Sequence, residues 1–512
     1  MKKITLKIAI CSIVLLSAAG CAKLNEKTYG TVSVDNGGAA SVSDLNGVYA
    51  QLNGQTDQAN TYALQEHSTD EMMGPTRGTD WGDFGTWRKL HTHTWNASHG
   101  QINDTWDQLN IGVFRASQVI GRATDNQIKA EASFLRAYFM FQVVDLYGQA
   151  PFRDPEAPNS SIPIVYNRTD ATAFIIKDLE FAEANLGTSP NVGKASKAAA
   201  QALLAKIYLN KAVYTSATVG GPFTFAKADM DKVIEYANKI TAAGYTLEPA
   251  GKYFQDFAWD NSEQSHGNIF GIYNTPTNVP ASAKNRWEMG LHYNQTPDGW
   301  NGFTTLADFY DSFQDGDERK GVAYPGLTDK VGLRAGFAIG QQYGPNNKAL
   351  TQRSGKPLIF TREVNLNYST EAQGIRVFKY FPHPNADGTV PTSGEDNDYI
   401  FLRYADVLLE KAEAIMRGGT DPAGQTPLEL VNAIRTPRGA TTLSAVTESD
   451  MLAERGRELY WEGWRRNDLI RFGKFNDPVD QRPAQTDKTR TLYPIPQRAV
   501  DTNPNLKQNP GY

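Results

Sequence analysis

Apolar positions recur every three or four residues through most of the first half of the chain, which is the spacing of helices that bury one face. In the segment 127–147, Ala132, Leu135 and Phe139 follow this spacing, and Gly148 ends it. The same periodicity predicts further helices at 42–52, 102–123, 170–186, 194–214 and 227–243. The first half of the chain is therefore predicted to be a set of packed helices.

Small residues line one face of the predicted helix at 194–214. Ala198, Ala202 and Ala205 recur there at three- and four-residue spacing, which lets neighbouring helices approach closely. The helix pairs follow one another at loosely regular intervals, which favours an array like that of tetratricopeptide repeats over exact 34-residue repeats. An irregular helical bundle without a superhelix is the alternative.

The pattern changes between residues 248 and 403, where Gly, Pro, Asn and aromatic residues predominate. Only short strand-like pieces occur there, at 269–273 and 375–380. Helical periodicity returns at 404–417, 427–435 and 448–472, and Gly473 follows the last of these where a helix C-cap favours glycine. We expect a mainly α protein in which a loop-rich insertion with a few short strands interrupts the helical scaffold.

The N-terminus has the layout of a secretory signal. Three lysines precede an apolar run at 8–16, and small residues lead to Cys21 in a segment that resembles the lipobox of bacterial lipoproteins. We expect cleavage before Cys21 and lipidation of that residue; an ordinary signal peptide with a chance cysteine is the alternative. Cys11, the only other cysteine, lies in the segment to be removed, so the mature chain is left without a disulfide.

These patterns together suggest the organisation of the chain. Residues 1–20 are a signal peptide, 21–40 a flexible tether, and 41–512 a single domain. Within that domain we distinguish an N-terminal half at 41–247, the insertion at 248–403 and a C-terminal part at 404–512. No later stretch approaches the 18 uninterrupted apolar residues of a membrane-spanning helix.

Composition and charge narrow the classes of function. The 51 Lys and Arg residues stand against 56 Asp and Glu, a net charge of -5, so no basic surplus is available to bind a phosphate backbone. We therefore expect no nucleic-acid partner. No Gly-x-Ser-x-Gly, His-Glu-x-x-His or phosphate-binding loop is present, and no cofactor is predicted. The 55 aromatic residues, 11% of the chain, are available for core packing or for ligand platforms.

Several sequence motifs follow one another in a characteristic order. They are AEASFLRAY at 130–138, DLYG at 145–148, RYADVLLEKAEA at 403–414, NAIR at 432–435, ERGRELYWEGWRRNDLIRFG at 454–473 and YPIPQ at 493–497. Together, behind a lipobox, they resemble the RagB/SusD family of Bacteroidetes outer-membrane lipoproteins, over nearly all of the mature chain. The charges within the motifs also suit pairing along helices, Glu454 with Arg457 and Glu462 with Arg465 or Arg466, and we expect these to be structural.

The resemblance implies a function as well as a fold. It implies a mostly helical protein, anchored through Cys21 at the cell surface, that sits over a SusC-like TonB-dependent transporter in the outer membrane. Such a protein captures nutrients, usually oligosaccharides, and has no catalytic activity. Some members of the family serve peptide transporters, so peptide or another nutrient remains an alternative ligand.

Two aromatic clusters are candidates for the ligand site. In the first, aromatic residues alternate with glycines, carboxylates and one arginine, which is typical of a loop that stacks on sugar rings and binds their hydroxyls. The second lies in the insertion and could form an opposing wall. The predicted ligand contacts are Arg77, Trp81, Asp83 and Trp87 from the first cluster, and Trp287, Tyr293, Trp300 and Asn301 from the second. Burial in the core is the alternative for each Trp, and it is the expectation for Trp106, Trp461 and Trp464, which fall in helical patterns.

Two other patterns suggest metal or catalytic chemistry. His91 and His93 have metal-like spacing but no evident third ligand, so ordinary surface histidines are expected. The acidic run with Asp311, Asp315, Asp317 and Glu318 lacks the register of a calcium loop, and a solvated helix end is expected. A glycoside hydrolase would need two carboxylates flanking the bond, for which Asp80, Asp83 and Asp298 are the candidates.

Overall fold

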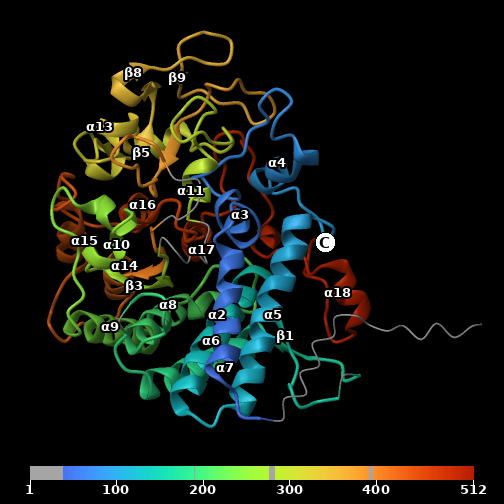
Figure 1. The fold of residues 1–512 in the computed structure, drawn as a ribbon. Coiled ribbons are helices and arrows are strands. Elements are labelled where there is room, and N and C mark those ends of the chain that lie inside the picture. The colour runs from blue at the N-terminus through green and yellow to red at the C-terminus, as the bar shows by residue number, and fades with distance from the viewer. Residues whose placement is uncertain (1–37, 159, 190, 276–282, 391–395) are drawn as a thin grey trace, which may run out of the picture. The chain divides into compact units, whose positions relative to one another are not determined.

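Long helices in the first half of the chain pack against one another in the order in which they occur. Helix α5 (Gly100–Arg122) packs on α6 (Asn126–Tyr147), α6 on α7 (Arg168–Asn185), α7 on α8 (Lys197–Thr215), and α8 on α9 (Lys227–Ala242), as Figure 1 shows. Each helix buries one face on its predecessor and another on its successor. The predicted mainly α scaffold of paired helices is confirmed.

The computed structural model describes residues 38–158, 160–189, 191–275, 283–390 and 396–512. Ala40–Tyr512 forms one compact unit, to which the following description refers. The predicted signal peptide, the lipidation site Cys21 and nearly all of the tether lie outside the described residues. Within those residues, no helix combines the length and the apolar character needed to cross a bilayer.

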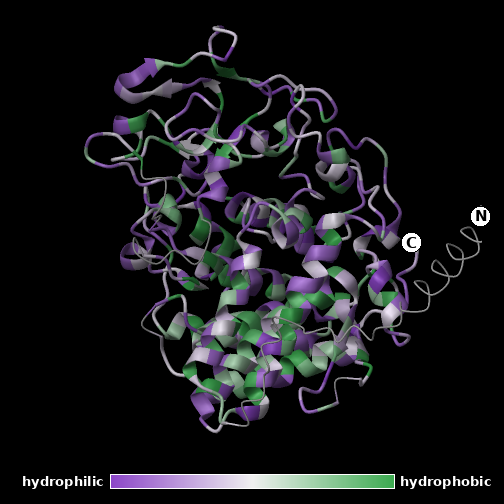
Figure 2. Cartoon of the chain, turned by 45° about the vertical axis from the view of Figure 1, so that its right-hand side comes forward, coloured by the Kyte–Doolittle hydropathy of each residue, from purple (hydrophilic) through white to green (hydrophobic). Residues whose placement is uncertain are grey.

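Local sequence signals set the ends of the central helix α6. The Asp125 side chain accepts a hydrogen bond from the backbone N–H of Gln127, and Gly148 adopts the left-handed conformation after the last turn. The helix is buried on almost every side, from Ala130 to Tyr147. Figure 2 shows the hydrophobic residues gathered in this helical half. It is therefore the core of the scaffold.

Shorter elements precede and accompany the helical scaffold. They are α2 (Val42–Tyr49), the 3-10 turn η1 (Ala50–Gln55), α3 (Asn60–Glu66), the 3-10 turn η2 (Asp83–Gly85), α4 (Thr86–His91) and the antiparallel strands β1 (Gln149–Phe152) and β2 (Ile164–Asn167). The predicted helix at 42–52 is thus an α-helix that continues as a 3-10 turn. Helices α3 and α4 were not predicted, because each is no longer than two turns and leaves little periodicity to detect.

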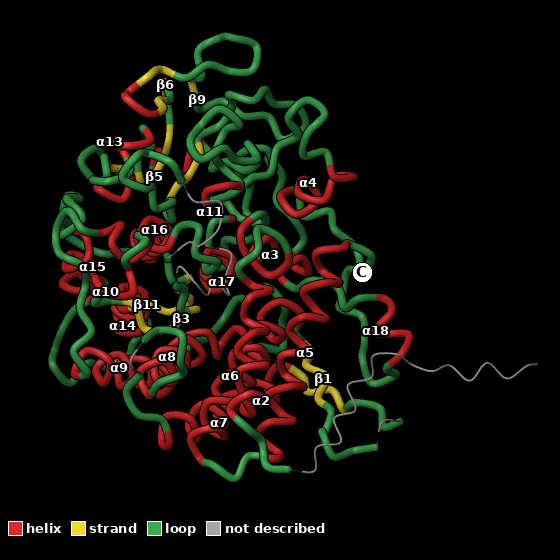
Figure 3. The backbone as a smooth tube through the Cα atoms, viewed as in Figure 1, coloured by secondary structure: helices red, strands yellow, loops and turns green. Residues whose placement is uncertain are grey.

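The insertion holds most of the strands and loops, as the predominance of loop in Figure 3 shows. Its helical pieces are η3 (Tyr253–Phe257), α10 (Asn261–Gln264), α11 (Asn285–Glu288), α12 (Ala307–Asp311), η4 (Glu318–Lys320), α13 (Thr328–Val331) and η5 (Pro345–Asn347). Its strands are β3 (Asn268–Ile272), β4 (Gly321–Val322), β5 (Ala335–Ala338), β6 (Gly340–Gln341), β7 (Tyr343–Gly344), β8 (Lys348–Ala349), β9 (Ile359–Phe360), β10 (Arg376–Phe378) and β11 (Tyr399–Arg403).

All strand pairs of the insertion are antiparallel. Strand β5 lies between β10 and β4, while β11 pairs with β3 so that Tyr399 faces Ile272. The small sheets β6–β9 and β7–β8 form a two-part ribbon at residues 340–360. The predicted strand pieces at 269–273 and 375–380 correspond to β3 and β10.

The C-terminal part returns to helices, but one of them is interrupted. Its elements are α14 (Tyr404–Met416), α15 (Pro427–Arg435), α16 (Glu448–Leu459), α17 (Arg465–Arg471), η6 (Lys488–Thr491) and α18 (Gln497–Thr502). The prediction of one helix over 448–472 was wrong, because Trp461 and Gly463 both have positive φ and turn the chain between α16 and α17. Trp106, Trp461 and Trp464 are buried in the core, as predicted.

Buried ion pairs attach the insertion to helix α16. The Arg319 guanidinium lies 2.7 Å from the Glu454 carboxylate and 3.1 Å from that of Glu458, all three fully buried. The predicted pairing of Glu454 with Arg457 is present at 2.6 Å. Removing one partner of such a pair leaves an uncompensated buried charge, which costs about 3–5 kcal/mol. These charges therefore hold the loops of the insertion in place.

The predicted pairing of Glu462 with Arg465 or Arg466 was wrong. Glu462 instead binds Arg403 at 2.7 Å and Lys379 at 2.5 Å, because the turn between α16 and α17 points it toward the insertion. Arg465 pairs with Asp70 and Arg466 with Asp145, at 2.7 and 2.9 Å. The motif at 454–473 therefore connects the insertion, the N-terminal loops and helix α6.

Candidate functional site

The two aromatic clusters of the sequence lie against each other in the structure. The backbone of Met73 forms an antiparallel bridge with that of Thr304. Beyond it, Arg77 Nε donates to the carbonyl of Gly302 at 3.0 Å, and Trp81 Nε1 donates to the carbonyl of Trp300 at 2.9 Å. The loop before α4 and the loop after α11 therefore build one surface from segments more than 200 residues apart.

Arg77 holds the loops of this surface together through buried hydrogen bonds. Its side chain is buried, and Nη1 donates to the carbonyls of Thr370 and Gln373 at 2.7 and 2.8 Å. Burial lowers the pKa of Arg77 to about 9. Two backbone segments, at Gly302 and at 370–373, thus share one guanidinium, which makes Arg77 a structural clamp for the site and leaves it little surface for a ligand.

Trp87 is buried within the same assembly. It lies in α4, is 6% exposed, and donates from Nε1 to the Asp83 carboxylate at 2.5 Å. Its ring packs 5.0 Å from that of Phe303 and 6.1 Å from that of Trp81. Since no ring face remains open, Trp87 can position Trp81 and Asp83 but offers no stacking platform.

Two residues of the second cluster are also buried. Trp287 in α11 is 5% exposed and Asn301 is fully buried. Asn301 donates to the carbonyl of Glu371 at 3.0 Å and accepts from Arg376 Nη2 at 2.9 Å. Both residues hold the loop after α11 in its course, and neither reaches the surface where a ligand could lie.

The predicted residues that keep exposed area are Trp81, Asp83, Tyr293 and Trp300. The Tyr293 hydroxyl donates to the Asp80 carboxylate at 2.9 Å, and the Arg353 guanidinium lies 4.3 Å from the Tyr293 ring. Burial and the Asp80 carboxylate raise the pKa of Tyr293, which keeps its phenol protonated as a donor. Aromatic faces and hydrogen-bonding groups thus lie side by side.

Two residues that the sequence did not mark out as contacts are exposed in the loops that carry this surface. Phe84 is fully exposed, and Tyr368 is 73% exposed beside Ser369, which forms a backbone bridge with Arg77. Phe84 has φ of +52° between Asp83 at +36° and Gly85 at +79°. The left-handed conformation is costly for the non-glycine residues Asp83 and Phe84, and such strain is concentrated at binding sites.

Arg353 and Glu371 complete the polar part of the surface. Arg353 Nε donates to the Glu371 carboxylate at 2.8 Å, and its Nη2 lies 3.8 Å from the Asp80 carboxylate. Arg353 is more than half exposed. No sequence signal points to either residue, because both lie in irregular loops far along the chain from Asp80 and Tyr293. We call Asp80, Trp81, Phe84, Tyr293, Trp300, Arg353 and Tyr368 the aromatic surface.

Two of the three candidate hydrolase carboxylates have structural partners. Asp80 accepts from Tyr293, and Asp83 accepts from Trp87. Asp298 is exposed at the other end of the loop that carries Tyr293.

The histidine pair is buried, so the expectation of surface histidines was wrong. His91 Nε2 bonds to the carbonyl of Asp480 at 2.8 Å, and the two ring nitrogens of His93 lie 2.9 Å from Thr486 Oγ1 and 2.8 Å from the carbonyl of Ser68. Burial lowers the pKa of His91 to about 4. Both rings pack the C-terminal segment onto the loop after α3.

Each carboxylate of the acidic run pairs with a different cationic side chain. Asp311 pairs with Arg362, Asp315 with Lys320, Asp317 with Arg319, and Glu318 with Arg438. Asp317 is buried, contrary to the expectation of a solvated helix end. Within the described part of the chain, no group of three or more His, Cys, Asp and Glu side chains is placed to hold a metal ion.

Solved structures share this arrangement of a helical scaffold and a loop-rich insertion. A SusD superfamily protein from Parabacteroides distasonis superposes with a TM-score of 0.70 at 20% identity, over 92% of this chain and 98% of that one. Surface glycan-binding protein A from Bacteroides thetaiotaomicron, solved in complex with laminarihexaose, gives 0.66 at 19% identity, over 91% and 98%. At this identity the likeness establishes the fold alone.

Sequence comparison establishes the family. Residues 256–512 match the SusD family, and residues 22–209 match a family described as starch-binding and associating with the outer membrane. The starch-binding protein SusD of Bacteroides thetaiotaomicron is 27% identical over 509 residues, which cover 88% of this chain and 85% of that protein. The chain belongs to the SusD family, as the motifs predicted.

Proposed function

We propose that this protein is a lipid-anchored subunit of the outer membrane that binds oligosaccharides at the cell surface and delivers them to a SusC-like TonB-dependent transporter. The observation that carries the proposal is the junction of Trp81 and Trp300, which brings half-buried aromatic rings beside the polar groups Asp80, Tyr293 and Arg353. Aromatic faces for sugar rings and directional donors for hydroxyls are what glycan recognition needs.

The relatives support a binding role in place of catalysis. SusD of Bacteroides thetaiotaomicron is named a starch-binding protein, and one structural neighbour is named a laminarin-binding SusD-like protein. Asp80 and Asp83 serve Tyr293, Arg353 and Trp87 as hydrogen-bond and ion-pair partners, which agrees with a site that holds ligands without cleaving them.

The sequence and the family description support the proposed location at the outer membrane. The lipobox ending at Cys21 would give an acyl anchor with the body of the protein in water. One of the matched families is described as associating with the outer membrane. A Cys21→Ser variant should lose acylation and leave the membrane fraction, and the wild-type chain should co-purify with a TonB-dependent barrel.

The binding proposal is tested by titrating the purified full chain, in detergent, with plant and microbial oligosaccharides in a calorimeter. Heat of binding without cleavage products supports it. Cleavage products would favour a hydrolase, and binding of short peptides in place of saccharides would favour the peptide-transport alternative.

A further inference from the structure

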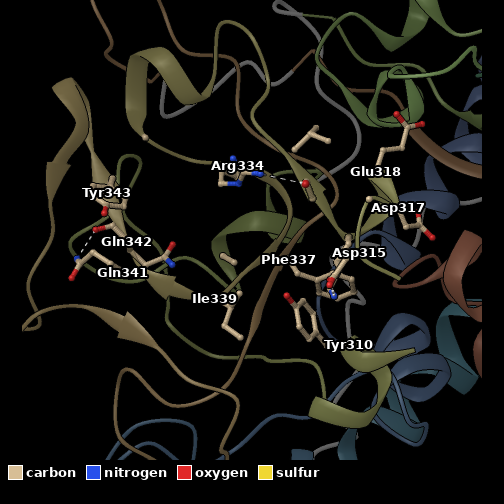
Figure 4. A pocket seen from close by; sticks show the side chains of 16 residues that line it. Tyr310, Asp315, Asp317, Glu318, Arg334, Phe337, Ile339, Gln341, Gln342 and Tyr343 are labelled. Carbon is tan, nitrogen blue, oxygen red and sulfur yellow. Dashed lines mark hydrogen bonds and ion pairs between the residues drawn. The ribbon is translucent and has the colours of Figure 1, made fainter. Parts of the chain in front are cut away.

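A cavity lies in the insertion, lined by residues outside the aromatic surface. Its volume is about 550 Å³, within the range of small-molecule sites. Residues of η4, β4, β5, β6 and β7 line it, and Figure 4 shows Arg334, Tyr310, Gln341 and Tyr343 around it. The ribbon at 340–360 lies between the cavity and the aromatic surface, since Tyr343 lines the cavity while the nearby Arg353 contacts Tyr293.

Among the described residues, every charged side chain that lines the cavity has an ion-pair partner except Arg334. Asp315 pairs with Lys320 at 2.9 Å, Asp317 with Arg319 at 2.7 Å, and Glu318 lies 3.6 Å from Arg438. Arg334 has no carboxylate within ion-pair distance among the described residues. Its guanidinium donates only to the carbonyl of Gly321, at 3.3 Å. One unpaired cation, with most of its N–H donors free, therefore faces the cavity.

The remaining wall combines aromatic rings with unused hydrogen-bonding groups. The Tyr310 ring packs edge-on against Phe337 with centroids 5.3 Å apart. Gln341 Nε2 donates to the carbonyls of Gln342 and Leu350, which orients its Oε1 as an acceptor. In the part of the chain that the structure describes, no group bonds to the hydroxyls of Tyr310 and Tyr343. These groups suit a ring that carries several hydroxyls.

We propose that this cavity is a second ligand site, specific for a saccharide unit with a single negative charge. A planar guanidinium with free donors binds a carboxylate or a sulfate ester through two parallel hydrogen bonds. A uronate and a sulfated sugar share this chemistry. The preference for an anion rests on Arg334 alone. The further step, that a sugar carries the anion, rests on the proposed function.

The test compares three probes on the full chain: oligogalacturonides, sulfated galacto-oligosaccharides and neutral galacto-oligosaccharides. Arg334→Gln should weaken the anionic probe at least tenfold, and the binding should weaken with added salt. Arg362→Gln, which alters an exposed arginine outside the cavity, is the matched control and should bind as wild type. Whichever anionic probe binds identifies the charged group as a carboxylate or a sulfate.

A second pair of variants separates this site from the aromatic surface. Tyr343→Ala should weaken the anionic probe, and Trp81→Ala should leave it bound. The inference is overturned if Arg334→Gln binds anionic saccharides as wild type, if Trp81→Ala abolishes that binding, if neutral probes compete for it equally, or if an acidic peptide binds equally well. The proposed function fails separately, when no saccharide binding of any kind depends on Trp81.

Discussion

The indole N–H of Trp81 donates a hydrogen bond of 2.9 Å to the backbone carbonyl of Trp300, 219 residues further along the chain. This bond fixes a half-buried ring of the first aromatic loop on the second. Trp81 itself has a positive φ of 58°, a conformation that a bulky residue adopts only when its surroundings compensate. The position of this ring is therefore determined by both loops.

Gly302 leaves the space that Trp81 occupies. A Cβ at this glycine would lie 2.4 Å from the Trp81 ring, so Gly302→Ala should push the ring out of place and weaken oligosaccharide binding roughly tenfold. Gly82→Ala is the matched control, because Gly82 has open space around it and an ordinary negative φ. Equal binding by the two variants, measured by calorimetry, would refute this role of Trp81.

Phe84 should matter for binding and not for stability. Its ring is fully exposed, so Phe84→Ala should change the free energy of unfolding by less than about 0.5 kcal/mol. Loss of one stacking face should weaken a saccharide several-fold. Tyr273→Ala, which truncates an exposed aromatic residue at the end of β3, serves as the control in the same titration and should have no effect.

The periodic part of the fold could be predicted from the sequence. Helices such as α6 and α8 are long, mostly buried segments bounded by local signals, so the chain alone carries the information. Periodicity did not reveal the break between α16 and α17, where the turn at Trp461 and Gly463 points Glu462 toward the buried side chains of Lys379 and Arg403. Tertiary contacts decided the structure there.

The candidate site was predictable in its location and less so in its details. Glycine-spaced aromatic residues identified both loops, and the structure brings them together. Which rings face outward depends on partners far along the chain: Phe303 covers Trp87, and the carbonyls of Thr370 and Gln373 hold Arg77 inside. Arg353 reached the site without any sequence signal for the same reason.

Arg77 should affect ligand binding indirectly, by stabilising the loops that carry the site. Arg77→Met removes hydrogen bonds to three buried or half-buried carbonyls, which should lower the free energy of unfolding by roughly 2–4 kcal/mol. Binding should weaken because the loops separate. Arg362→Met, at an exposed ion pair, should change stability little. Chemical denaturation measures both, and an unchanged stability for Arg77→Met would contradict the clamp.

Glu413 should make stability depend on acid pH. Burial opposes its ionisation, but Arg471 and Arg417 outweigh burial and lower its pKa from 4.5 to about 2. Because the folded pKa is depressed, the stabilisation, about 3 kcal/mol, is complete above pH 4.5 and is lost as the pH falls toward 2. Glu413→Gln should therefore be much less stable than wild type at pH 7, and the difference should shrink near pH 2.

The control for this pH dependence is Glu235→Gln. Glu235 lies on the exposed face of α9, where its lysine partners lower its pKa but solvent screens the pair. The stability of the Glu235→Gln variant should stay close to that of wild type at pH 7 and at pH 2. A Glu413→Gln difference that persisted unchanged to pH 2 would show that the carboxylate charge is not what stabilises the protein.

The most direct measurement is calorimetric titration of wild type and Trp81→Ala with the saccharide panel, with chromatography of each mixture afterwards. We predict that wild type binds at least one neutral oligosaccharide without cleaving it, and that Trp81→Ala loses this binding while its unfolding transition stays cooperative. Unchanged binding by Trp81→Ala, or release of shorter saccharides, would contradict a capture site built on Trp81 and Trp300.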